Sequence, residues 1–147
     1  MKSRLLVLMA GMLVLAFASS GYCEEAKSCE LIGKLHTFVN KMETIALYET
    51  PATKAKESAV ALMKEYSEVF GKAKELAAKG DAPLKEALGR LAAFQANTME
   101  CAKCSRSYRA LFIDLVAYEQ CKKKSCVPFQ KAVAALRTMA YKCKSGK

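Results

Sequence analysis

The sequence predicts an all-α protein: a small helical bundle of four or five helices with a disulfide-stapled C-terminal antiparallel helical hairpin. Glycine and proline, which interrupt helices, number only 7 and 3 among 147 residues. Apolar residues recur at steps of three and four, as they do along one face of an amphipathic helix. The chain also contains seven cysteines, enough to cross-link a domain with a small core.

Residues 1–18 are expected to be a cleavable signal peptide. Lys2 and Arg4 precede an apolar or glycine run over residues 5–17, and Ala16-Phe17-Ala18 matches the small-residue pattern of a cleavage site. The run is shorter than the roughly 20 apolar residues of a membrane-spanning helix. We therefore expect an exported protein, periplasmic or secreted, in which residues 19–147 form one helical domain without a transmembrane segment.

The first two helices are delimited by their apolar stripe and by turn residues. Leu31, Leu35, Phe38, Met42 and Ile45 lie on one face and predict a helix over residues 27–48. Thr50-Pro51 is expected to end it and to open a second helix, with Thr50 as the N-cap, that reaches residue 79. Residues 80–83, Gly-Asp-Ala-Pro, then predict a helix end, an aspartate N-cap and the first turn of a new helix.

The C-terminal part is predicted to be a basic, cysteine-rich hairpin over residues 97–147, following near-neutral helices over residues 19–96. An uninterrupted helix of 39 residues would be long for this domain, so we expect a break near Asn97-Thr98. Residues 122–125, Lys-Lys-Lys-Ser, are expected to form the turn of the hairpin. Pro128 fits the first turn of a last helix that reaches about Cys143.

Four cysteines predict the register of this hairpin. Cys104 and Cys121 lie 17 residues apart, as do Cys126 and Cys143. Facing residues of an antiparallel hairpin are equidistant from its turn, which predicts the pairs Cys104–Cys143 and Cys121–Cys126. Each cysteine also lies on the apolar stripe of its helix. The arrangement resembles the twin-CxnC helical hairpins, in which two nested disulfides clamp two antiparallel helices, although the spacer of 16 residues is longer than usual.

Three cysteines remain outside this pattern. A Cys29–Cys101 disulfide would tie the first helix to the bundle and leave Cys23 free or available to a disulfide-linked partner. A Cys23–Cys29 pair is the alternative, because sequence does not decide connectivity.

Positive charge is concentrated in the predicted hairpin. Residues 101–147 carry a net charge of +9, whereas residues 19–100 carry −1. A positive field attracts anionic partners, here an envelope lipid, lipopolysaccharide, a cell-wall polymer or an acidic protein, while nucleic acid is not expected. The alternative is that the charge serves only solubility. The candidate anion-binding residues are Arg106, Arg109, Lys122, Lys123, Lys124, Lys131, Arg137, Lys142 and Lys144.

A rival function follows from residues 99–104, Met-Glu-Cys-Ala-Lys-Cys. The CxxC within them looks like a dithiol redox motif, and MxCxxC looks like the heavy-metal motif of copper chaperones. These resemblances imply thiol-redox or soft-metal chemistry at Cys101 and Cys104. Both families place the motif after a strand, and no strand is predicted before Met99, so we favour a structural role.

No other constellation of residues predicts catalysis. His36 is the only histidine, and it borders an apolar stripe. Asp114 lies within an apolar run and is expected to pair with Arg137 or another basic neighbour. We therefore expect a non-enzymatic protein with no catalytic residues, no metal site and no cofactor.

Overall fold

A computed structural model describes the backbone of residues 2–146 and the side chains of residues 25–146, and within this part the chain is helical without strands. The helices are α1 (Lys2–Tyr48), α2 (Ala52–Glu65), α3 (Ser67–Ala78), α4 (Ala82–Arg109), α5 (Leu115–Cys121), the π-helical segment η1 (Lys122–Cys126) and α6 (Val127–Ser145). The predicted all-α bundle with a stapled C-terminal hairpin is confirmed. The side chains of the predicted signal peptide and of Cys23 lie outside the described residues.

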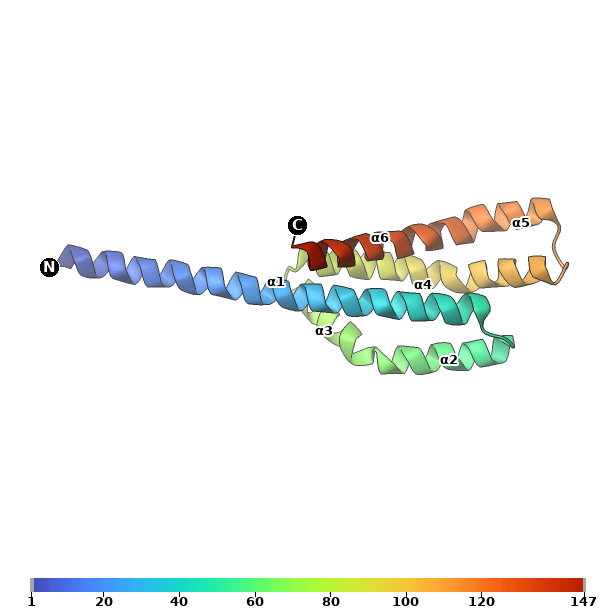
Figure 1. The fold of residues 1–147 in the computed structure, drawn as a ribbon, viewed down its shortest axis with the longest axis horizontal. Coiled ribbons are helices and arrows are strands. Elements are labelled where there is room, and N and C mark those ends of the chain that lie inside the picture. The colour runs from blue at the N-terminus through green and yellow to red at the C-terminus, as the bar shows by residue number, and fades with distance from the viewer. Residues whose placement is uncertain (1, 147) are drawn as a thin grey trace.

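The helices run alternately up and down the bundle (Figure 1). α1 and α4 point the same way, while α6 returns antiparallel and packs against both. α2 and α3 return along α1, and α3 also packs against α4. The α1–α2 and α4–α5 connections therefore lie at one end of the bundle, and the C-terminus lies toward the other.

The core forms where α1, α4 and α6 meet. Leu35, Phe38 and Val39 of α1 are fully buried, because residues three and four apart share one helix face. Between α4 and α6, the rings of Phe94 and Phe129 stack with centroids 5.1 Å apart. Burial of such apolar side chains is the main favourable term in folding.

The predicted second helix is divided in two. Tyr66 leaves helical geometry between α2 and α3, and its ring packs 5.4 Å from that of Phe38. The break allows α3 to contact both α1 and α4, whereas α2 packs along α1. Thr50 is not the N-cap of α2, because the extended residue Pro51 occupies that position.

The connection from α3 to α4 follows the prediction. Gly80 has a positive φ of 104°, which glycine adopts without a steric penalty. Asp81 is the N-cap of α4: its Oδ1 accepts a hydrogen bond from the amide of Leu84 at 2.9 Å. Its Oδ2 accepts from the hydroxyl of Ser28, which links this cap to α1.

The predicted break near Asn97-Thr98 is wrong. α4 continues through both residues, and each side chain donates to a carbonyl one turn earlier: Asn97 Nδ2 to Ala93 at 2.7 Å and Thr98 Oγ1 to Phe94 at 2.5 Å. These bonds satisfy polar groups that would otherwise favour a helix end. The predicted turn at residues 122–125 is also wrong, because η1 continues α5 into α6.

The six cysteines that were predicted to form disulfides do form three, but all three predicted pairings are wrong. The pairs are Cys29–Cys143, Cys101–Cys126 and Cys104–Cys121, with Cα atoms 5.3, 4.7 and 6.1 Å apart. The predicted pairs Cys104–Cys143 and Cys121–Cys126 placed the turn ten residues too late, and Cys29 pairs with Cys143 in place of the predicted Cys101. Because the turn lies near residue 113, CxxC at 101–104 faces CxxxxC at 121–126, and the two disulfides are nested.

Candidate functional site

The C-terminal hairpin consists of the second half of α4, the turn at residues 110–114, and the continuous α5, η1 and α6. Leu111 lies in the turn and has a φ of 59°, in the left-handed region that residues other than glycine rarely adopt. Asp114 then opens α5 as its N-cap, because its Oδ1 accepts from the amide of Ala117 at 2.7 Å. The predicted pairing of Asp114 with a basic side chain is wrong, because its carboxylate accepts a hydrogen bond from a backbone amide.

Two tyrosines pack across the hairpin directly behind this turn. The rings of Tyr108 on α4 and Tyr118 on α5 stack with centroids 4.2 Å apart and an angle of 16° between their planes. The Cys104–Cys121 disulfide lies one turn further back. The ring stack, the N-cap and the disulfide together hold the turn in one position.

Two of the predicted anion-binding residues have another role. Arg106 Nη2 donates to the carbonyl of Ala46 at 2.8 Å, and Arg109 Nη2 donates to the carbonyl of Leu47 at 3.0 Å. Both carbonyls belong to the last turn of α1, where backbone acceptors lack helical partners and the helix dipole is negative. The two arginines therefore cap α1 from the neighbouring helix.

Arg106→Ala is expected to lower the free energy of unfolding by about 1–2 kcal/mol, because the carbonyl of Ala46 loses a charged donor. Lys131→Ala removes the same charge from an exposed position and should leave stability unchanged. Urea denaturation of both variants measures the difference. Equal stabilities would show that the contact between Arg106 and α1 contributes nothing.

Two further lysines of the hairpin region pair with carboxylates. Lys122 lies 3.6 Å from Glu119 and 6.0 Å from the ring centroid of Tyr118. Lys103 pairs with Glu100 at 2.7 Å. By contrast, six basic side chains are exposed and form no ion pair with a carboxylate of residues 25–146. These unpaired cations are Lys123, Lys124, Lys131, Arg137, Lys142 and Lys144.

The unpaired cations do not form a single stripe. Lys131 and Lys142 are 11 residues apart, about three turns, and share one side of α6. Arg137 and Lys144 are two turns apart and share another side, beside α1. Burial lowers the pKa of His36 on α1, and the charges of Arg137 and Lys144 lower that pKa further. The lowered pKa favours the neutral imidazole, and the unpaired cations lie on two sides of α6.

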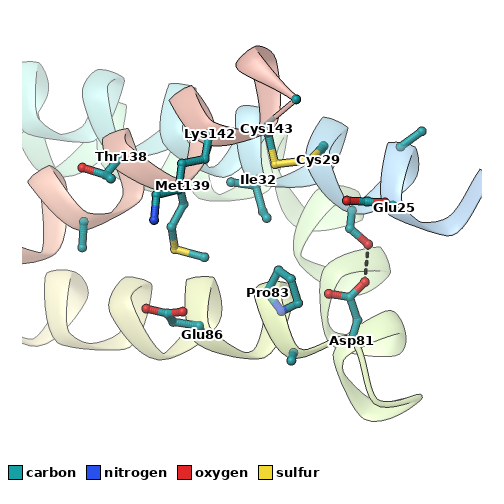
Figure 2. Close-up of a pocket in the computed structure, with 15 residues that line it drawn as sticks. Glu25, Cys29, Ile32, Asp81, Pro83, Glu86, Thr138, Met139, Lys142 and Cys143 are labelled. Carbon is teal, nitrogen blue, oxygen red and sulfur yellow. Dashed lines mark hydrogen bonds between the residues drawn. A yellow bond between two sulfur atoms is a disulfide. The ribbon is translucent and has the colours of Figure 1, made fainter. Parts of the chain in front are cut away.

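A cavity lies between α1, α4 and α6, at the end of the bundle away from the hairpin turn. It has a volume of about 1150 Å³, and the Cys29–Cys143 disulfide forms part of its wall (Figure 2). Asp81 lines the cavity with both carboxylate oxygens already hydrogen-bonded. Glu25, Glu86 and Lys142 are the other charged side chains around it.

Cys101 and Cys104 are buried and are not paired with each other. Each sulfur is bonded to a cysteine of the facing segment, so neither is a thiolate that could attack a disulfide or bind a soft metal in this state. Within residues 25–146, no three histidine, cysteine or acidic side chains gather as metal ligands.

Sequence reasoning missed a cluster of exposed apolar side chains around the turn of the hairpin. Leu111, Phe112, Leu115 and Val116 surround the turn and are 90%, 87%, 60% and 69% exposed. We call these four residues the apolar apex. The predicted hairpin, with its turn at residues 122–125, places this run inside a helix, although Asp114 in its middle is a residue typical of N-caps.

The fold and this surface define a class: an all-α, disulfide-stapled bundle with a basic hairpin and an apolar apex. No known protein family, no curated protein and no solved structure matches the chain. Within the part of the chain that the structure describes, no helix is long and apolar enough to cross a membrane.

Proposed function

We propose that this chain is an exported, non-enzymatic protein that binds an anionic partner through its basic C-terminal hairpin. The partner is an anionic surface or polymer, and the unpaired cations supply the attraction. The capping arginines, Arg106 and Arg109, hold the hairpin against α1 and contribute to binding only through their charge.

The observation that carries the proposal is a contrast in ion pairing. Many basic residues of α1 to α4 pair with carboxylates, and exposed pairs of this kind largely cancel their own fields. The six unpaired cations around η1 and α6 have no such neutralisation, so the field of the hairpin extends into solvent. The pairs that precede the hairpin are Lys34–Glu30, Lys41–Glu65, Lys54–Glu49, Lys72–Glu68, Lys79–Glu75 and Arg90–Glu86.

Two observations support export. Three disulfides cross-link the described part of the chain, and such bonds persist in oxidising compartments outside the cytosol. The N-terminal sequence has the pattern of a signal peptide. In such a compartment the accessible anions are lipid headgroups, lipopolysaccharide and cell-wall polymers.

Simultaneous Lys123→Glu, Lys124→Glu and Lys131→Glu substitutions are expected to weaken binding to heparin, used as a soluble polyanion, about 100-fold. Each lysine near an anionic surface contributes about 1 kcal/mol, and tenfold in affinity corresponds to about 1.4 kcal/mol. The matched control is Lys56→Glu, Lys64→Glu and Lys74→Glu, which changes net charge equally on exposed, unpaired lysines of α2 and α3. Affinity measured between about 50 and 500 mM salt should fall steeply for the native protein.

The far-UV spectra of both triple variants should match that of the native protein, because all six positions are exposed. Equal losses of heparin binding would locate the attraction in net charge and not in the hairpin. Native binding that ignores salt, or no binding at all, would contradict the proposed function.

A further inference from the structure

The apolar apex presents four large side chains to solvent at a projecting end of the bundle (Figure 1). Other exposed apolar residues, such as Val60 and Tyr141, lie on different helices. Isolated exposed apolar residues are ordinary on protein surfaces, but clusters mark sites that are covered by a partner. The apex is such a cluster, built from six consecutive positions of the chain.

The apolar side chains of the apex are exposed because the turn that carries them is fixed by its neighbours. Leu111 is in the left-handed region, which is unfavourable for a residue with a side chain and normally selects glycine or asparagine. Asp114 fixes the start of α5, and the Tyr108–Tyr118 stack closes the hairpin behind it. The apex thus combines unburied apolar surface with a backbone conformation that is unfavourable for leucine.

The side chains change from apolar to aromatic to basic with distance from the turn of the hairpin. The apolar apex comes first, the tyrosine pair lies about one turn behind it, and Lys122, Lys123 and Lys124 follow about one further turn along the chain. A lipid monolayer has the complementary order: hydrocarbon, then an interface that favours tyrosine, then headgroups that attract lysine when they are anionic.

We propose that the apolar apex inserts into the surface of an anionic lipid bilayer. The inference rests on the proposed function and names its partner: the lysines bind the headgroups, and the apex enters the acyl boundary. Insertion is shallow, because the carboxylate of Asp114 lies within the apex and must stay near the headgroup layer. A lipid surface can accommodate a turn that projects from the end of the bundle.

A single tryptophan tests insertion directly, because the natural chain contains none. In Phe112→Trp, emission should shift to the blue and be quenched by brominated lipid when vesicles of phosphatidylcholine and phosphatidylglycerol are added. Tyr141→Trp is the matched control: this position is 72% exposed and lies near the end of α6 away from the apex. Its emission should not change. A tryptophan at position 112 that stays in water while the protein is vesicle-bound would overturn the proposal.

A second variant separates insertion from charge. Leu111→Asn with Phe112→Ser keeps a residue that tolerates the left-handed turn and removes two apolar side chains. Vesicle affinity should fall about tenfold for each side chain, while heparin binding stays native. If the variant kept both its vesicle affinity and its heparin binding, insertion of the apex would be overturned, but the proposed function would stand. Native protein that self-associates through the apex, as measured by sedimentation, would instead assign the apex to a second copy of the chain.

Discussion

Replacement of Cys29 and Cys143 by alanine is expected to lower the free energy of unfolding by about 5 kcal/mol. Their disulfide joins residues 114 positions apart, and the entropy that a cross-link removes from the unfolded chain grows with the length of the loop. Small proteins have total stabilities of about 5–15 kcal/mol, so this one bond accounts for a large share. Both residues are half-buried, so a cavity contributes little to the loss.

The nested disulfide provides the matched control for this experiment. Cys104→Ala with Cys121→Ala should cost roughly 2–3 kcal/mol, because Cys101–Cys126 still closes almost the same loop. Urea denaturation of the two double variants, with the native protein measured before and after reduction, gives the comparison. Equal losses, or melts that reductant does not change, would show that the loop constraint does not determine stability.

Phe94→Ala is expected to cost about 3–5 kcal/mol, the usual range for an aromatic side chain removed from a filled core. The Phe94 ring is completely buried and stacks on Phe129, so its loss leaves a cavity between α4 and α6. Phe112→Ala on the same hairpin should leave stability unchanged, since that ring is 87% exposed. Chemical denaturation distinguishes the two. A Phe112 variant that is equally destabilised would mean that the apex packs against the bundle in solution.

Local signals in the sequence were sufficient to predict the ends or the buried face of several helices. Gly80, Asp81 and Pro83 together define a helix end and a helix start, because each residue type has one strong backbone preference. The stripe containing Leu35 and Phe38 identifies the buried face of α1 for a similar reason. In these segments local and tertiary preferences agree.

The register of the hairpin could not be predicted in this way. The cysteine spacing permits two symmetric registers of the hairpin, one with its turn near residue 123 and one with its turn near residue 113. The second was hidden because its turn contains neither glycine nor proline, and Leu111 takes the conformation that such residues usually supply. Lys122 to Lys124 resemble a turn by composition, but α5 and α6 continue through them. Only long-range packing selects between the registers.

The basic composition of the hairpin was evident from the sequence, but the contacts of its individual residues were not. Nine basic residues were assigned to anion binding from charge alone. Arg106 and Arg109 instead cap α1, and Lys122 pairs with Glu119, since these contacts depend on which helices become neighbours. The apolar apex escaped prediction because an exposed Leu-Phe pair and a buried one look the same in sequence.

The Cys29–Cys143 bond has a consequence for proteolysis. It closes almost the whole bundle into a covalent ring, so one peptide-bond cut between these cysteines releases no fragment. A cut in the α3–α4 turn at Gly80 would leave the two pieces joined through the sulfurs, and a cut at Phe112 would leave them joined through the nested pair as well. The nicked protein would run as one band until it is reduced. A single cleavage would therefore leave the lysines of η1 and α6 attached to the rest of the bundle.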